Sequence, residues 1–241
     1  MSKRIENEIA HGKKLLAEGA ESVWNWESAA GKKRANRRAS FFIDLAKMKP
    51  GDKALEIGCG TGLFTRKVYE ATKADITAID ISEDLLNEAR KLLPEANFVV
   101  DDAMNLRAAA NTYDVVYGSS VLHHLEFDAS LKEILRVLKP GGRMIFAEPN
   151  MINPQILIQK NVPFIKKWLG DSPDETAIVR WSFAKLMQEK GFKKVSIFPY
   201  DFLHPLVPDF LIAAVDTLGK VIEKIPLVKE IAGSVIIYGE K

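Results

Sequence analysis

The sequence predicts an α/β fold in which helices cover both faces of a mostly parallel, doubly wound sheet. Strand-length apolar runs alternate with helical patterns from residue 53 to residue 148, and this alternation is typical of parallel sheets. The first apolar run ends in a glycine-rich turn that contains Gly58, Gly60 and Gly62, and a helical pattern follows at once. Open α/β sheets bind nucleotide-like ligands at this first strand-to-helix turn.

The individual elements follow from local patterns along the chain. Strand-length apolar runs cover residues 53–57, 76–80, 97–100, 113–118, 143–148, 193–199 and 234–238. Helical patterns cover residues 63–72, 82–92, 129–137 and 181–190. Ser82 provides an N-cap before two acidic residues, and Pro140-Gly141-Gly142 ends the third of these helices.

Composition limits the class of protein. The chain has 241 residues, of which 47% are hydrophobic and 27% charged, as in folded globular proteins. The formal net charge of +2 does not indicate a nucleic-acid partner. The chain contains no apolar run of about 18 residues or more, and its first residues lack the apolar core of a signal peptide. We therefore expect a cytoplasmic protein.

Cysteine and histidine usage argues against disulfide and metal chemistry. Cys59 is the only cysteine, so an intramolecular disulfide is excluded, and its place between two glycines favours a buried spacer over a nucleophile. The four histidines, of which His123 and His124 are adjacent, include no pair at the helical spacing of metal ligands. We expect no metal site.

Two details of spacing indicate which ligand the glycine-rich turn binds. The glycines follow the pattern G-x-G-x-G, whereas the turns that bind a dinucleotide pyrophosphate read G-x-G-x-x-G. Asp80 closes the next apolar run about 20 residues later, where a carboxylate accepts hydrogen bonds from ribose hydroxyls. The ligand is therefore predicted to be a nucleoside without a diphosphate.

Five sequence blocks then occur in order: LEIGCGTG, AIDIS, FVVDDAMNL, YDVVYGSSVLHHL and LKPGGRMIFAEPN. In these blocks the chain resembles the class I S-adenosylmethionine-dependent methyltransferases, and within them the small-molecule group that includes the quinone-biosynthesis enzymes. The likeness covers residues 36–150 well and 179–202 loosely. It implies a seven-stranded sheet whose last strand runs antiparallel beside the sixth. It also implies S-adenosylmethionine as cofactor, S-adenosylhomocysteine as product, and a small or lipophilic methyl acceptor.

The resemblance assigns cofactor binding to ten residues of these blocks: Glu56, Gly58, Gly60, Thr61, Gly62, Asp80, Ile81, Asp102, Ala103 and Ser119. The glycines would allow close backbone approach, Asp80 would hold the ribose, and Ile81 would pack on the adenine. Asp102 would accept from the adenine amino group, with Asp101 as its rival. A buried Glu56 needs a polar partner, for which the cofactor's ammonium group is suitable.

The sequence does not decide how a proton leaves the acceptor. His123 and His124 follow the fourth strand, where an imidazole can accept a proton near neutral pH. We slightly prefer His123 as the catalytic residue, and Glu148 at the end of the fifth strand is the other candidate. An acceptor that is already nucleophilic needs neither of them.

The chain divides into an N-terminal helical lid, residues 1–50, and a methyltransferase domain, residues 51–241. We expect a loop near Gly31 in the lid, followed by a basic run of residues 32–38. Such a run is usually a solvated helix face, and the alternative is that one of its arginines meets the methionine carboxylate or an anionic acceptor.

Two insertions, at about residues 149–178 and 200–233, begin at the ligand-binding edge of the sheet and are expected to roof the acceptor site. The second contains a predicted apolar helix over residues 209–224. Either this helix packs on apolar residues of the first insertion, or part of it contacts a lipophilic acceptor or a membrane surface. The second alternative gains support from Lys160, Lys166 and Lys167.

Two other function classes share some of these features. An NAD-dependent oxidoreductase would share the turn and the ribose carboxylate, but it would require the longer glycine spacing. A binding protein without turnover would keep the same cofactor residues. The chain lacks an NPPY-type acceptor motif, so we expect no nucleic-acid substrate. The sequence leaves the oligomeric state open.

Overall fold

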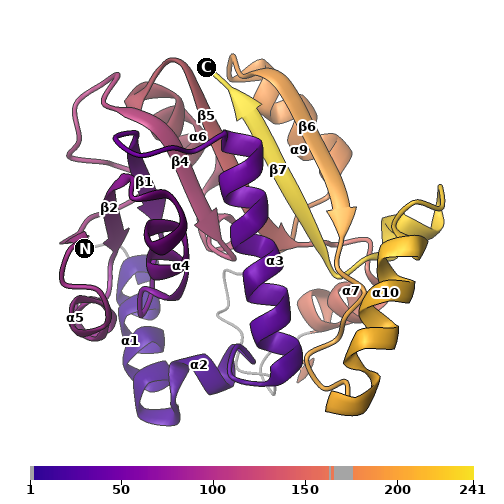
Figure 1. Cartoon of the computed structure of the whole chain (residues 1–241). Helices are drawn as coiled ribbons and strands as arrows, with labels where there is room; N and C mark the ends of the chain where they lie inside the picture. Colours follow the sequence, from indigo (N-terminus) through magenta and orange to yellow (C-terminus); the bar gives the residue numbers. More distant parts are fainter. Residues whose placement is uncertain (1–2, 163, 166–175) are drawn as a thin grey trace.

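The computed structural model describes residues 3–162, 164–165 and 176–241 (Figure 1). Its centre is one seven-stranded sheet with the strand order β3-β2-β1-β4-β5-β7-β6. The strands are β1 (Lys53–Ile57), β2 (Asp75–Asp80), β3 (Asn97–Val100), β4 (Tyr113–Ser119), β5 (Leu138–Pro149), β6 (Lys193–Tyr200) and β7 (Ser234–Glu240). β7 lies between β5 and β6 and runs antiparallel to both, while the neighbouring pairs among β1 to β5 are parallel. The predicted fold class, including the antiparallel last strand, is confirmed.

Helices cover both faces of this sheet (Figure 1). The longer ones are α1 (Lys3–Glu18), α3 (Ala29–Ala46), α4 (Leu63–Thr72), α5 (Glu83–Leu92), α6 (Phe127–Val137), α9 (Arg180–Glu189) and α10 (Ile212–Ile222). The shorter ones are α2 (Ala20–Val23), α7 (Pro154–Asn161), η1 (Leu122–His124), η2 (Asp209–Leu211) and η3 (Val228–Ile231). One buried apolar cluster joins α3, α4 and α5 to the sheet, and a second joins α6 and α9 to its other face. None of the helices in the described part of the chain has the length and apolar character needed to cross a membrane.

The strand order reverses beside β1, because the chain passes from β1 to β2 on one side and returns to β4 on the other. The carboxyl ends of β1 and β4 therefore diverge at a topological switch point, where open α/β sheets form a ligand crevice. The fifth strand is longer than predicted. It starts directly after α6, and its residues 139–142 bulge between two register segments that pair with β4.

The predicted loop near Gly31 is wrong, because Gly31 lies in the first turn of α3. The connecting turn comes earlier, at residues 24–28, and Ser28 caps the helix by accepting a hydrogen bond of 3.0 Å from the Gly31 amide. Glycine is required because the turn crosses directly over the helix. A Cβ at this position would lie 1.9 Å from the backbone oxygen of Asn25.

Gly31→Ala is expected to push the 24–28 turn away from α3 and to lower the free energy of unfolding by about 1 to 3 kcal/mol or more. Trp24 and Trp26 lie in this turn, so their fluorescence should change and S-adenosylhomocysteine should bind more weakly. Ser40→Ala is the control, because Ser40 is exposed on the same helix. Denaturant titration and fluorescence test this expectation. Equal stability and equal affinity in the two variants would contradict it.

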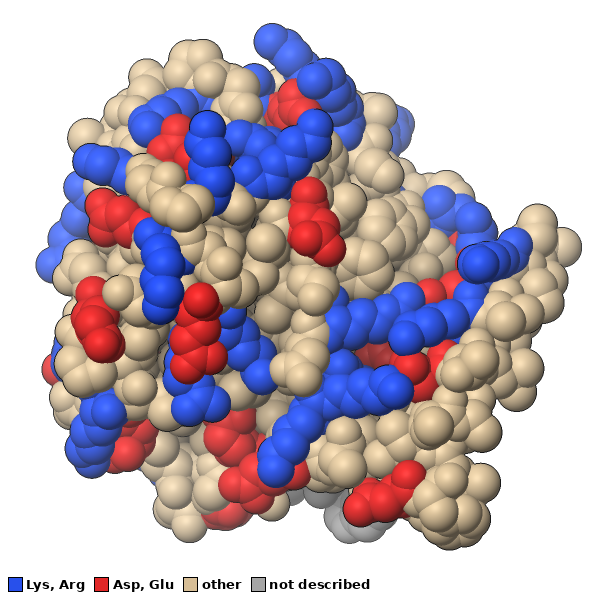
Figure 2. All heavy atoms as spheres, viewed as in Figure 1, with Lys and Arg blue, Asp and Glu red and all other residues tan. Residues whose placement is uncertain are grey.

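The basic run of α3 is not the solvated face that we expected. Arg34 Nε lies 2.7 Å from Asp201 Oδ2, and Arg37 Nη1 donates to Glu223 Oε1 at 2.7 Å. Figure 2 shows cationic and anionic side chains side by side in the strip between α3 and α10. The run was misread because its carboxylate partners come from the second insertion, more than 160 residues later in the chain.

The helix of the second insertion is α10, which is shorter than predicted because residues 209–211 form the 3-10 turn η2. Its inner face packs mainly on α3 and on the segment after β6, where Ala30, Leu203 and Ile212 form one buried cluster. The expected partner surface on the first insertion is weak in the described residues, since α7 buries none of its side chains. Lys166, Lys167, Trp168 and Leu169, which also belonged to that expectation, lie outside the described residues.

Candidate functional site

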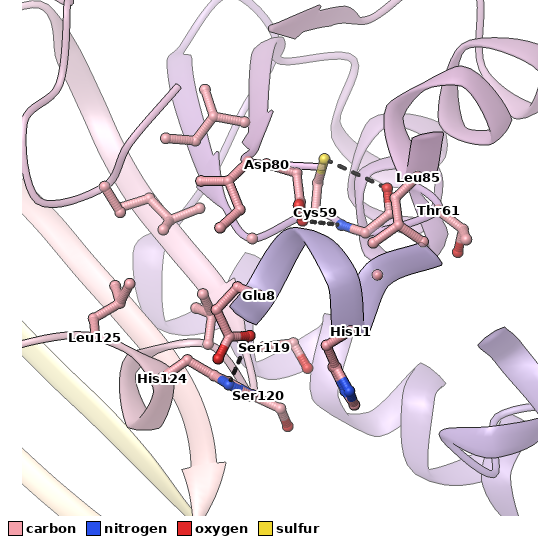
Figure 3. A pocket seen from close by; sticks show the side chains of 18 of the residues that line it. Glu8, His11, Cys59, Thr61, Asp80, Leu85, Ser119, Ser120, His124 and Leu125 are labelled. Carbon is pink, nitrogen blue, oxygen red and sulfur yellow. Dashed lines mark hydrogen bonds and ion pairs between the residues drawn. The ribbon is translucent and has the colours of Figure 1, made fainter. Parts of the chain in front are cut away.

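A cavity of about 280 Å³ lies at the carboxyl ends of β1, β2 and β4. Its walls come from the glycine-rich turn, the loop after β3 and the segment around η1, and its roof comes from α1 and the 24–28 turn (Figures 1 and 3). The volume is near the lower end of the range for small-molecule sites, which begins at about 300 Å³. The sheet and the N-terminal segment thus enclose one site between them.

The glycine-rich turn forms the floor of this cavity. Gly58 and Gly60 line it with φ values of 66° and 54°. A Cβ on Gly58 would lie 2.3 Å from Val121, and a Cβ on Gly60 would lie 2.9 Å from the ring of Trp24. Gly62 lies outside the cavity at the N-cap of α4, where a Cβ would meet the Cβ of Ala89 at 3.0 Å. Two of the three predicted glycines therefore line the cavity, and the third allows helix packing.

Asp80 faces the cavity from the end of β2 (Figure 3). Its carboxylate accepts hydrogen bonds from the backbone amides of Gly60 and Ser82, both at 2.9 Å. Burial raises the pKa of this carboxyl above its ordinary value, although these amide bonds act in the opposite direction. Asp80 thus both holds the glycine-rich turn and presents a carboxylate to a ligand.

Glu56 lies beneath the turn and does not line the cavity. Its buried carboxyl accepts a hydrogen bond of 2.9 Å from the hydroxyl of Tyr117. Burial, assisted by the nearby charge of Asp80, raises the pKa of Glu56 to about 8. The polar partner that the sequence assigned to the cofactor is, in the structure, a tyrosine from β4.

The loop after β3 brings Asp101, Asp102 and Ala103 to the cavity wall. Asp101 accepts from the backbone amide and the guanidinium of Arg107 at 3.1 and 3.2 Å, as well as from the amide of Asp102. Asp102 accepts one hydrogen bond of 2.9 Å, from the amide of Met104, and this bond occupies one of its oxygens. Asp102 therefore keeps more acceptor capacity for a ligand than Asp101 does.

The remaining predicted cofactor residues, Thr61, Ile81 and Ser119, all line the cavity. The hydroxyl of Thr61 donates to the carboxylate of Glu21 in α2, which ties the glycine-rich turn to the N-terminal segment. Ser119 accepts a hydrogen bond of 2.8 Å from Arg38.

Arg38 is a residue whose role the sequence did not identify individually. It is 3% exposed and also donates to the hydroxyls of Ser120, Tyr200 and Ser234, at 3.0 to 3.2 Å. It therefore supports the serines of the cavity wall from behind.

The two predicted catalytic residues, His123 and Glu148, lie together behind the cavity wall and not on it. His123 Nδ1 is 2.7 Å from Glu148 Oε2, while the other carboxylate oxygen accepts from the amides of Val121 and Leu122 at 2.9 Å. Burial alone would raise the pKa of Glu148, but the bonds to His123 and to the two amides outweigh it and hold this pKa below its ordinary value. The pair fixes the course of the chain after β4.

A second histidine does reach the cavity (Figure 3). His124 Nδ1 lies 3.3 Å from Glu8 Oε2 of α1, and both residues line the cavity. The rings of His123 and His124 are 4.2 Å apart between centroids. Sequence reasoning missed Glu8 because nothing local in α1 indicates that the helix returns over the sheet edge.

Comparison with known proteins identifies the family. A methyltransferase domain model matches residues 55–146. The chain is 30% identical over 174 residues to the demethylmenaquinone methyltransferase of Staphylococcus haemolyticus, with 62% of this chain and 72% of that protein covered. It is 36% identical over 175 residues to the 2-methyl-6-phytyl-1,4-hydroquinone methyltransferase of a Synechocystis species, with 69% of this chain and 54% of that protein covered.

The fold comparison agrees. A crystal structure of a methyltransferase from Thermotoga maritima, described as a possible histamine N-methyltransferase, superposes with a TM-score of 0.65 at 19% identity. The match covers 96% of this chain and 99% of that one. The chain spans 31% to 63% of the length of several other curated relatives that it matches. The predicted family and its methyl donor are thereby confirmed: this chain belongs to the class I S-adenosylmethionine-dependent methyltransferases.

Proposed function

We propose that this protein transfers a methyl group from S-adenosylmethionine to a small, lipophilic acceptor. The observation that carries this proposal is the carboxylate of Asp80, which faces a cavity floored by the positive-φ glycines Gly58 and Gly60. The relatives that are named for demethylmenaquinone and for a phytyl hydroquinone support a lipophilic acceptor. When bound, the cofactor supplies a sulfonium methyl group that is ready for displacement.

The chain's own residues hold and orient the donor. We assign the ribose hydroxyls to Asp80 and one adenine edge to Asp102, with Ala103 and Ile81 completing the adenine pocket. Thr61, Ser119 and the glycine-rich turn would surround the methionine part. Glu56 acts from beneath the turn, and Gly62 sets the start of α4. Within the predicted lid of residues 1–50, α1 and the 24–28 turn would cover the bound cofactor and exclude water, because they roof the cavity, whereas α3 packs on the sheet.

For proton removal we propose His124 in place of His123 and Glu148. We propose that His123 and Glu148 position the segment after β4, because both are buried and bonded to each other. His124 is then the imidazole that can accept a proton from an acceptor in the cavity, and Glu8 orients it from the lid.

A methyl-transfer assay tests both the function and the assignment. Purified protein, methyl-labelled S-adenosylmethionine and a series of isoprenoid 1,4-hydroquinones should yield a methylated product. His124→Ala is expected to lower kcat by roughly 100-fold or more, the scale of general base catalysis, and to remove the loss of activity on the acid side of the pH profile, where the imidazole of the wild type is protonated. S-adenosylhomocysteine affinity should stay nearly unchanged in this variant.

His11→Ala is the matched control, since His11 also lines the cavity (Figure 3). If His124→Ala keeps the wild-type kcat and His123→Ala loses it, the assignment returns to His123. If none of the isoprenoid hydroquinones is methylated although the cofactor binds tightly, the proposed acceptor class is contradicted.

A further inference from the structure

The helix α10 is apolar on two faces, and only one of them packs against the protein. Its inner face carries Ile212 and Gly219, which meet the cluster on α3 and the side chain of Phe202. Its outer face, together with the turn η2 that precedes it, carries apolar side chains that are exposed to solvent in the described structure. Their exposed fractions are 83% for Phe210, 40% for Leu211, 59% for Leu218, 53% for Val221 and 44% for Ile225.

These five side chains form one stripe. Leu218 and Val221 lie on one face of α10, because residues three apart are neighbours on a helix, while Phe210 and Leu211 precede α10 in η2 and Ile225 follows its end. After Pro226 the stripe is extended by Leu227, which is 83% exposed, and by Val228. We call these seven residues the outer apolar stripe. Figure 2 shows the flank of the molecule along α10 as almost free of charged side chains. A surface helix of a globular protein normally has one apolar face, so a second one indicates a contact.

The charges around the stripe are unequal in sign. The carboxylates of Asp216 and Glu223 turn inward, where Asp216 lies 3.0 Å from Lys33 and Glu223 binds Arg37. Asp209, at the start of η2, is the exposed carboxylate beside the stripe. Lys224 and Lys229 stand at its other end. Internal pairing therefore neutralises most of the insertion's acidic groups, whereas Lys224 is exposed and Lys229 is half-buried.

A basic groove borders the stripe on this side. Arg37, Lys220, Lys224 and Lys229 line this groove of about 440 Å³, together with Glu223 and the aromatic rings of Phe41, Phe198 and Tyr200. Arg37 is paired with Glu223 and Lys220 with Asp216, so Lys224 and Lys229 supply most of the net positive charge of the groove. Lys224, which lines the groove, directly precedes Ile225 of the outer apolar stripe in the chain. Apolar side chains bordered by lysines are the arrangement of helices that lie in a lipid interface, where the lysines reach anionic head groups.

We infer that the outer apolar stripe and the basic groove bind the surface of an anionic lipid bilayer. The stripe would enter the boundary between head groups and acyl chains, and the groove would receive a lipid phosphate. Each lysine near an anionic surface contributes to such binding, and the apolar side chains supply the remainder. This inference goes beyond the proposed function and does not depend on it.

Vesicle cosedimentation of the full chain tests the inference. Wild-type protein should bind phosphatidylcholine vesicles that contain about 30% phosphatidylglycerol at least tenfold more tightly than pure phosphatidylcholine vesicles. Phe210→Ser/Leu218→Ser should lower binding to the anionic vesicles tenfold or more. Lys224→Gln/Lys229→Gln should remove most of the preference for anionic lipid. Leu92→Ser/Trp181→Ser is the control, because it removes exposed apolar side chains from α5 and α9.

Circular dichroism and S-adenosylhomocysteine binding should match wild type in all three double variants. Equal vesicle binding by the two α10 variants and the control would overturn the inference. The inference would also be overturned if the wild-type protein bound neither the anionic nor the pure phosphatidylcholine vesicles. A wild-type dimer that Phe210→Ser/Leu218→Ser dissociates, without vesicle binding, would replace the bilayer by a second copy of the chain. Methyl transfer to a soluble acceptor would persist in each of these cases, so the proposed function is tested separately.

Discussion

Asp80→Ala is expected to weaken S-adenosylhomocysteine binding by about 1.5 to 3 kcal/mol, which is roughly 10- to 150-fold in Kd. The carboxylate would accept hydrogen bonds from the ribose hydroxyls, and it also accepts from the amides of Gly60 and Ser82. The variant therefore loses a ligand contact and a support of the glycine-rich turn. Asp80→Asn keeps the shape of the side chain but not its charge, so its Kd for S-adenosylhomocysteine should lie between those of wild type and Asp80→Ala.

Isothermal titration calorimetry measures this loss, with Asp75→Ala as the control. Asp75 lies at the opposite end of the same strand and is exposed. Because burial raises the pKa of Asp80, affinity should be constant near neutral pH and should fall on acidification at a higher pH than an ordinary aspartate would give. This acid-side loss should disappear in Asp80→Ala. An unchanged Kd in that variant would remove Asp80 from the ribose contact.

The free energy of unfolding is expected to fall as pH rises toward 8, because Glu56 loses its proton. The folded protein holds the Glu56 proton with a pKa of about 8, whereas the ordinary value is 4.5. The folded state therefore binds this proton more tightly than the unfolded chain does. The resulting stability is fully present below about pH 4.5 and is lost as pH rises toward 8, by an amount on the order of a few kcal/mol.

Glu56→Gln should flatten this decline, because the amide keeps an acceptor for the Tyr117 hydroxyl and cannot ionise. Urea titrations between about pH 5.5 and 8.5 would give the free energy of unfolding for both proteins. The control is Glu70→Gln, whose carboxylate is 64% exposed on α4. If wild type and Glu56→Gln show the same slope with pH, Glu56 does not hold its proton in the folded state.

The sequence predicted the sheet and the floor of the site well, because these depend on local patterns. The strand-length runs place β1 to β4 within a residue or two, and the glycine spacing together with Asp80 identifies the ligand edge. The parts that were missed depend on contacts between distant segments. Arg34 pairs with Asp201, which lies 167 positions later in the chain, and His124 lies beside Glu8 of α1.

The same reason explains the errors in single residues. The pair His123 and Glu148 has the chemistry of an acid-base site, but only the packing of η1 against β5 shows that both are buried. Gly31 resembles a loop glycine in the sequence, yet the backbone of the preceding turn crosses the helix at that point. Predictions about the catalytic roles, the lid, the acceptor and the cytoplasmic location stay predictions.

The most direct measurement is a calorimetric titration of the purified protein with S-adenosylhomocysteine and, separately, with NAD. We expect saturable binding of S-adenosylhomocysteine at one site, weakened by Asp80→Ala to the extent given above, and no saturable binding of NAD. Tight binding of NAD with no response to S-adenosylhomocysteine would contradict this expectation.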